Sequence, residues 1–509
     1  MHPCLLVSEI FDLIAQFANE DGSSPSAVAS LARTCRAFQE PAEDVLWRRL
    51  NGLVPLMHCF RGDICSSADK QYYFTKPFDA KSEDWQRFTR QAKRVHALAL
   101  GQSFDIDAEM KALQVLDLCR PASSVALLPN LRELRWCDYK EISLRYMHLF
   151  AHPGLVAFNA LIIAKPHLLS DTLSYLSIAT PGLKYLKVTP GAHEHDDSEV
   201  SNAVQRLLVS LPGLAEFSAR APLCATTLHA LAYHPRLEIL SVRLPSRIDG
   251  CSYTQPTGSR TFRTLRRLTV FSSSIDDVVP LLNIIQSPRF VELALHVKIQ
   301  PTVASLRSLF AAISRHHSIR SLSILVASST GQRPSQAVPI QTSAQYVLTG
   351  DVIRALHGLR RLAHLILTQI PTDLGDQAIF DMAAAWPHLE RLSLGTMTRL
   401  ENRALSLEAL RYIASSCPRL RELALTFNSA LPGPSSIKGS GKQRSASATS
   451  LSRLELFDVG CSEIHDVMRF AQFLANVFPR ARACDRHGPR YRASSMALVH
   501  KEKTRLLAC

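Results

Sequence analysis

The sequence predicts an α/β solenoid, in which helices alternate with short parallel strands, preceded by a small helical module. Three observations predict this fold class: a short apolar pattern that recurs along most of the chain, helical segments ended by proline between its copies, and an N-terminal stretch of different pattern. The 509 residues exceed what one compact core usually holds, and a repeat array is one way to extend such a chain. With 46% hydrophobic and 20% charged residues, the chain has the composition of a folded protein.

The recurring pattern is an apolar residue, a second one three positions later and a third one two positions after that. Leu389-Glu-Arg-Leu392-Ser-Leu394 is a clear copy. The alternation at its end predicts a short strand, because side chains two apart share one face of a sheet. Most copies start 18 to 31 residues after the previous one, a spacing that favours a repeat architecture. The fourteen copies begin at Val95, Leu113, Leu131, Leu155, Leu183, Leu214, Leu237, Leu265, Phe290, Ile319, Leu362, Leu389, Leu420 and Leu451.

An amphipathic helix is predicted before many of these copies. In the stretch SLEALRYIASSCPRL, Leu407, Leu410 and Ile413 fall on one helical face. Proline often follows, and because it cannot continue a helix it marks the turn into the strand. Each unit is therefore predicted to be a helix, a proline turn and a strand. The prolines of these turns are Pro153, Pro181, Pro212, Pro235, Pro288, Pro387 and Pro418.

These units resemble the leucine-rich repeat, whose signature is L-x-x-L-x-L. The resemblance implies stacked repeats that share one core, with short parallel strands on the concave side and helices on the convex side. One feature departs from the family. The asparagine or cysteine expected three residues after the last leucine is matched only by Asn428, which predicts irregular turns.

The repeats are expected to span residues 95–485, with a degenerate last repeat near the end of that range. Two loops without apolar anchors, 327–345 and 432–450, are expected to interrupt them and to be disordered. Residues 51–94 are expected to form a linking helical region, and residues 486–509 a basic tail.

Residues 1–50 form a different unit, which we interpret as three short amphipathic helices. A first helix carries apolar residues on one face, a second follows after the polar stretch NEDGSSPS, and Pro41 is expected to open a third. This segment has seven acidic and four basic residues, a net charge of −3, which leaves +17 on the rest of the chain. The split suggests two surfaces with different partners.

This stretch resembles the F-box, a three-helix module found at the N-terminus of many eukaryotic repeat proteins. The matching residues are Leu6-Val7-Ser8-Glu9-Ile10, the stretch from Leu31 to Phe38, and Leu46-Trp47-Arg48, with Val7 where the family usually has proline. The whole arrangement is similar to the large F-box and leucine-rich-repeat family of mushroom-forming fungi.

The resemblance implies that the helices dock on the Skp-type adaptor of a cullin–RING ubiquitin ligase, while the repeats capture the protein to be ubiquitinated. Such a receptor performs no chemistry and needs no cofactor. The residues expected to contact the adaptor are Leu6, Ile10, Ile14, Leu31, Cys35, Phe38, Leu46 and Trp47.

Substrate contacts are predicted on the concave strand face, at the residues beside the last two apolar positions of each copy. The predicted contact residues lean basic in the middle repeats, which would suit an acidic or phosphorylated substrate. Asp117 and Glu455 meet the same positional rule. The predicted substrate residues are Arg135, Lys187, Arg220, Arg243, Arg267, Phe271, His296, Arg391 and Phe457.

Other functional classes fit the sequence less well. The stretch GPSSIKGSGKQ fails as a phosphate-binding loop because Ser436 and Gln443 occupy two of its required positions, and no G-x-S-x-G or H-E-x-x-H occurs. His193 and His195 could bind a metal, but a solvated turn is the simpler interpretation. Nucleic acid is not an expected partner, because aromatic residues are not interleaved with the basic ones.

Two further expectations concern location and role. No secretory signal and no membrane span are recognised, and the twelve cysteines contain no C-x-x-C pair, so we expect a cytoplasmic or nuclear location. The alternative to a ubiquitin role is a leucine-rich interaction scaffold, in which the N-terminal helices only cap the repeats.

Overall fold

The computed structural model describes most of the chain, which divides into two compact units, residues 1–237 and 238–509. The described residues are 8–18, 25–60, 65–68, 71–74, 83–101, 106–120, 126–138, 143–162, 166–190, 198–245, 261–326, 343–395, 405–428, 453–460, 462 and 464–484. Residues 327–342 of the first predicted loop, the whole second loop 432–450, the whole predicted tail 486–509 and the HEHDD stretch therefore lie outside the described residues.

The first unit begins with three helices around a small core. They are α1 (Ser8–Ala18), α2 (Pro25–Ala32) and α3 (Arg36–Arg48). Phe11 of α1 stacks on Phe38 of α3 at 4.2 Å between ring centroids, and Val28 of α2 closes the same cluster. Pro41 lies in the second turn of α3. The prediction that Pro41 opens this helix is therefore wrong.

A parallel sheet follows α3 directly. Its first strand, β1, pairs with β4 in register, so the sheet begins at Arg49 and not at the predicted residue 95. The strands of this unit, in spatial order, are β1 (Arg49–Asn51), β4 (Ala97–Leu100), β5 (Glu133–Asp138), β6 (Ala157–Ile162), β7 (Tyr185–Pro190) and β8 (Glu216–Pro222).

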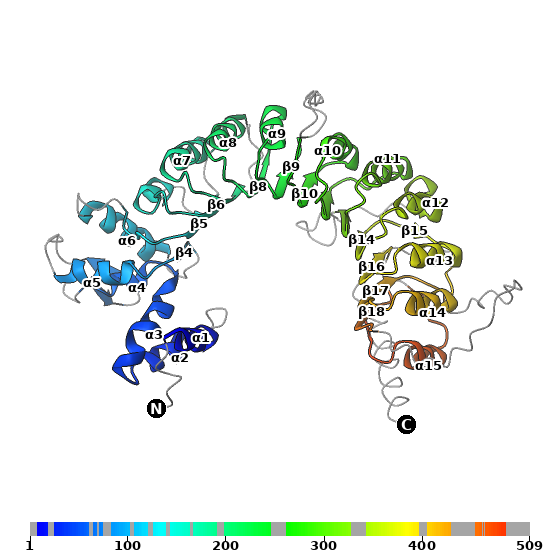
Figure 1. The fold of residues 1–509 in the computed structure, drawn as a ribbon, viewed down its shortest axis with the longest axis horizontal. Coiled ribbons are helices and arrows are strands. Elements are labelled where there is room, and N and C mark those ends of the chain that lie inside the picture. The colour runs from blue at the N-terminus through cyan, green and yellow to red at the C-terminus, as the bar shows by residue number, and fades with distance from the viewer. Residues whose placement is uncertain are drawn as a thin grey trace, which may run out of the picture. The chain divides into compact units, whose positions relative to one another are not determined.

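Helices connect these strands and form the second layer of the unit (Figure 1). Between β1 and β4 the chain forms two helices and the antiparallel hairpin β2–β3. Phe60, Trp85 and Phe88 pack there with ring centroids 5.2–5.5 Å apart, so the predicted linker contains a packed aromatic cluster. The elements are α4 (Val54–Met57), β2 (Cys65–Ala68), β3 (Gln71–Phe74), α5 (Glu83–Ala92), α6 (Ile106–Cys119), η3 (Ser143–Leu149), α7 (Pro166–Ala179), α8 (Ser198–Ser210) and α9 (Ala225–Ala232).

The second unit has the same two layers, one of parallel strands and one of the helices that connect them (Figure 1). Its strands are β9 (Ile239–Arg243), β10 (Arg267–Ser272), β11 (Glu292–Val297), β12 (Ser321–Val326), β14 (His364–Thr368), β16 (Arg391–Leu394), β17 (Glu422–Leu425), β18 (Leu456–Asp458) and β19 (Arg482–Cys484). The connecting elements are η5 (Ile275–Asp277), α10 (Val278–Ile284), α11 (Val303–Ile313), η7 (Ala344–Tyr346), α12 (Gly350–Ile353), η8 (Arg354–Leu356), α13 (Asp376–Ala385), α14 (Leu407–Ser416) and α15 (Val467–Val477), with the small pair β13 (Leu348–Thr349) and β15 (Thr372–Asp373).

The apolar pattern forms the core, as predicted. Leu389, Leu392 and Leu394 are buried completely, and the second leucine of one repeat lies opposite its equivalent in the next, as Leu392 does with Leu423. The α/β leucine-rich-repeat fold predicted from the sequence is confirmed by these stacked rows.

Two of the fourteen predicted copies are misplaced. Leu113 lies inside helix α6, because apolar residues three apart also suit a helix. The copy predicted to begin at Leu451 begins instead at Leu454, with Phe457 and Val459 as its next buried residues. Phe457 pairs with the core residue Leu423 and is fully buried, so its prediction as a substrate contact is wrong.

A ladder of polar side chains connects the turns that precede the strands. Each side chain, at the end of a helix or just after it, donates a hydrogen bond to a backbone carbonyl of the preceding repeat, which satisfies that buried acceptor. The bonds are His234 Nε2 to Leu211 O at 2.9 Å, His316 Nε2 to Leu282 O at 3.2 Å, Trp386 Nε1 to Leu356 O at 3.4 Å and Cys417 Sγ to Trp386 O at 3.6 Å. Many residues that follow the strands lie outside the described residues, so irregular turns there stay a prediction.

Histidines in these turns make stability sensitive to acid. Burial lowers the pKa of His152, His234, His316 and His357. Nε2 of His152, Nδ1 of His234 and Nε2 of His357 also have no hydrogen-bond partner among the described residues. Below the ordinary histidine pKa of about 6.5, the unfolded chain binds protons that the folded chain does not bind. The free energy of unfolding therefore decreases as the pH is lowered.

We therefore expect the urea midpoint to fall between pH 7.5 and pH 5.5, and to fall less in the double variant His234→Gln, His316→Gln. The exposed His317→Gln is the control and should follow the wild type. If the urea midpoint of the double variant falls as much as that of the wild type between these pH values, this assignment is wrong.

The corrected register of β18 has its own test. Phe457→Ala should cost about 3–5 kcal/mol, because it empties a buried aromatic site. Leu456→Ala, on the neighbouring and partly exposed position, should cost clearly less. Equal losses in unfolding free energy for the two variants would favour the register predicted from Leu451.

Candidate interaction surfaces

Helix α1 presents an apolar face outward from the three-helix core. Its residues Ile10, Leu13, Ile14 and Phe17 are 39%, 55%, 39% and 68% exposed. They recur at i, i+3, i+4 and i+7, which places them on one side of the helix. Phe11 of the same helix fills the core, so α1 is apolar both inward and outward. An exposed apolar face of this kind is a candidate protein-interaction site.

The predicted adaptor residues divide between this face and the core. Ile10 and Ile14 are exposed on it, and Trp47 is partly exposed on α3. Phe38 is buried against Phe11, so its prediction as a contact residue is wrong. Three more predicted contacts are partly buried against the same core, and Leu6 lies outside the described residues. Those three are Leu31, Cys35 and Leu46.

Leu13 and Phe17 are contact candidates that the sequence reasoning missed. Their signal was present in the sequence, since both continue the spacing that Ile10 and Ile14 begin. Phe11 lies on the opposite side of the same helix, and its place in the core is shown by its packing against Phe38.

Arg94 attaches the three-helix module to the first repeat. Its guanidinium forms ion pairs with Glu40 and Asp44 of α3, and with Glu43 at 3.6 Å, and Nη1 also donates to the Glu40 carbonyl at 3.4 Å. The hydrogen bond from Arg94 lowers the pKa of Glu40. Because Arg94 lies just before β4, these contacts hold α3 on the start of the sheet.

On the strand face of the first unit, the register brings together residues from three neighbouring strands. Arg135 of β5 lies opposite Asn159 of β6, which lies opposite Lys187 of β7. Both predicted cations are exposed, as is Arg220 on β8. Neither Arg135 nor Lys187 forms an ion pair with any residue that the structure describes.

On the strand face of the second unit, several predicted contacts pair with residues of adjacent strands. The predicted contacts Arg267 and Arg391 form ion pairs with Glu292 at 3.4 Å and Glu422 at 3.1 Å on the adjacent strands. Phe271 and His296 stack at 4.6 Å with an interplanar angle of 15°, and Arg243 is exposed beside them. Cross-strand ion pairs therefore neutralise much of the positive charge expected in the middle repeats.

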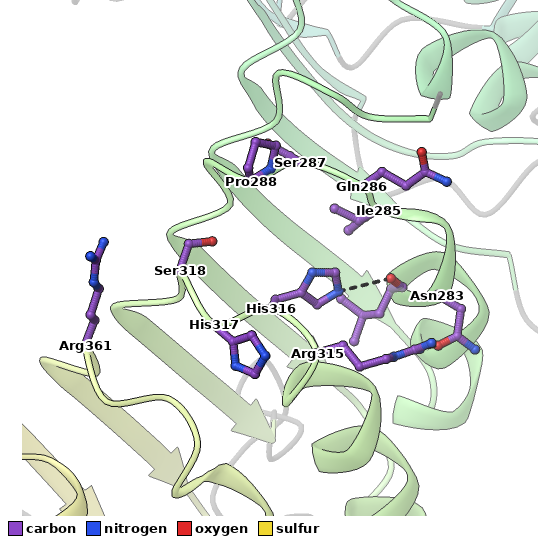
Figure 2. A pocket seen from close by; sticks show the side chains of 11 residues that line it. Asn283, Ile285, Gln286, Ser287, Pro288, Arg315, His316, His317, Ser318 and Arg361 are labelled. Carbon is purple, nitrogen blue, oxygen red and sulfur yellow. Dashed lines mark hydrogen bonds between the residues drawn. The ribbon is translucent and has the colours of Figure 1, made fainter. Parts of the chain in front are cut away.

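A hollow of about 610 Å³ opens at the turns that follow helices α10 and α11. Arg315, His317 and Arg361 line it together with partly buried His316. Figure 2 shows Arg315 directed to Asn283, to which it donates a hydrogen bond, while Arg361 lies at the other side of the hollow. The cationic groups do not converge, and cations just beyond helix C-termini are explained by the helix dipoles.

Metal and membrane sites receive no support from the described part of the chain. Within it, no three histidine, cysteine or acidic side chains group as metal ligands. None of its helices is long and apolar enough to span a bilayer.

No family model matches the chain, and no curated protein matches it. Solved structures that are similar include a chain of the Rad7 and Elc1 complex in yeast, with 15% identity and a TM-score of 0.33 over 75% of this chain and 85% of that one. The leucine-rich repeat-containing protein LegL7 from Legionella pneumophila is 10% identical, with a TM-score of 0.30 over 72% of this chain and 96% of its own. Because these TM-scores are below 0.5, the fold is assigned from the strands and helices of this chain alone.

The attachment at Arg94 can be tested by amide hydrogen exchange. Arg94→Gln should speed exchange in α3 about fivefold, as expected when partly screened ion pairs worth about 1 kcal/mol are lost. Lys93→Gln removes the same charge from an exposed neighbour and should leave α3 unchanged. Equal exchange in the two variants would show that Arg94 does not hold α3.

Proposed function

We propose that this protein is a non-catalytic substrate receptor of a Skp–cullin–F-box ubiquitin ligase. The observation that carries the proposal is the exposed apolar face of α1, formed by Ile10, Leu13, Ile14 and Phe17, on a three-helix module whose sequence resembles the F-box. The repeats would hold the substrate, and the module would bind the Skp-type adaptor and, through it, the cullin.

The energetics of the module support a partner on this face. A unit of about 45 residues buries little apolar surface by itself, and four large apolar side chains in water add nothing to its stability. Covering them transfers apolar area from water, at roughly 25 cal/mol per Å². An adaptor that contributes its own apolar groove would supply that cover.

Function then follows from proximity alone. Because Arg94 and β1 hold the module on the first repeats, a substrate bound to those repeats is kept at a restricted distance from the adaptor. Such tethering raises the effective concentration of substrate lysines near a charged ubiquitin-conjugating enzyme. The receptor itself contributes no reacting group in this scheme, and we propose that it acts in the cytoplasm or nucleus.

A second candidate is an interaction scaffold whose N-terminal helices only cap the repeats. The direct run of α3 into β1, and the contacts of Arg94, favour this alternative because a cap must cover the end of the sheet. However, a cap needs a polar outer surface for solubility, whereas the outer side of α1 is apolar.

Co-purification with a Skp-type adaptor tests the proposal. Phe17→Asp should weaken adaptor binding by roughly thirtyfold or more, the value of a central interface contact worth about 2 kcal/mol. Gln16→Asp introduces the same charge at the adjacent exposed position and should bind like the wild type. Both substituted side chains are exposed, so both variants should unfold at the wild-type midpoint.

The wild-type result separates the two candidates. Adaptor binding that Phe17→Asp abolishes supports the receptor. If wild-type protein fails to bind any Skp-type adaptor, the receptor proposal is wrong and the helices act as a cap.

A further inference from the structure

We infer that the strand face formed by β5, β6 and β7 binds a phosphoryl group on an extended segment of a partner protein, through Arg135, Asn159 and Lys187. The identification of that partner as the substrate rests on the proposed receptor function. The binding itself does not, because this surface is far along the sequence from α1 and needs no adaptor.

The strand register creates the arrangement. The three residues occupy one row across adjacent parallel strands, so neighbouring Cα atoms are about 4.8 Å apart and those of Arg135 and Lys187 about 9.6 Å apart. Long cationic side chains at that separation can both reach one group placed above Asn159. The row continues into small, buried residues on both sides, Ala99 and Ser218, so the solvent-accessible part of the row is Arg135, Asn159 and Lys187.

The rows on either side of this one add hydrogen-bond donors, together with two carboxylates that do not pair with Arg135 or Lys187. Tyr185 and Thr189 flank Lys187 on the same face of β7, and Ala157 keeps the centre of its row small. Two acidic residues, Glu133 and Glu216, flank Ala157 and Tyr185 in one of these rows and lie two residues before Arg135 and Ser218. Neither Glu133 nor Glu216 forms an ion pair with Arg135 or Lys187.

Two unpaired cations in one row distinguish this surface from the strand face of the second unit, where Arg243 is the predicted arginine contact without an ion pair among the described residues. There, Arg267, Arg391 and His364 each have a glutamate within 3.1–3.6 Å. Arg135 and Lys187 have none among the described residues, so their charge is available to an external anion.

The chemistry of the row favours phosphate over carboxylate. A phosphorylated side chain carries a charge of about −1.5 to −2 and three acceptor oxygens, which two cations and an amide match in charge and in number of donors. The guanidinium can donate two parallel hydrogen bonds, and the ammonium acts as a compact second charge. A single carboxylate would leave one cation uncompensated.

Fluorescence anisotropy on the full chain tests this inference. The probe is a labelled peptide pool with a central phosphoserine and degenerate flanking positions, compared with the same pool unphosphorylated. The test variant is Arg135→Ala, Lys187→Ala, and the control is Arg132→Ala, Lys184→Ala, which removes two exposed cations from the start of the same two repeats. We expect wild type and control to bind the phosphorylated pool about tenfold or more tightly than the test variant does.

Three results would overturn the inference. The first is a wild-type protein that binds both pools equally, and the second is an equal loss in the two double variants, which would indicate unspecific charge attraction. The third is displacement of the peptide by a 20-nucleotide single-stranded RNA that binds more tightly and depends on the same two residues, which would identify a nucleic-acid site. Loss of phosphopeptide binding would leave the adaptor result unaffected, so the two proposals fail separately.

Discussion

The in-register stacking of apolar residues between neighbouring repeats is the constraint on which the rest of the structure depends. One strand and one helix cannot bury their apolar faces alone, and each repeat therefore completes the core of the next. The pairing of Leu392 with Leu423 on the adjacent strand is one example of this stacking. A register change of one residue would exchange the buried and exposed faces of a strand, so the same constraint also decides which side chains remain available for partners.

The polar groups of the turns follow from the same stacking. Repeats that approach closely bury backbone carbonyls between them, and those carbonyls need donors. This chain meets that need with side chains such as His234 and Trp386, which lie in the turns before the strands. The donors differ in chemistry because the requirement is for an N–H, O–H or S–H at that place and not for a particular residue.

Sequence reasoning predicted the fold because its signal is local and repeated. Leu389, Leu392 and Leu394 needed only their spacing to be recognised as core. The same reasoning failed at Phe457, because Leu451, Leu454 and Leu456 satisfy the pattern as well as the true copy does, and only the neighbouring strand decides between them. Interaction surfaces were less predictable: the ion pair of Arg267 with Glu292 depends on a residue 25 positions away, and the place of Asn159 between two cations depends on three strands at once.

We propose that an adaptor covers α1 in the working protein. Amide hydrogen exchange of the full chain, with and without a Skp-type adaptor, tests it most directly. The account predicts slower exchange along α1 (Ser8–Ala18) when the adaptor is present, with the strands from β5 to β8 unchanged. Unchanged exchange in α1 at adaptor concentrations that saturate known receptors would contradict it.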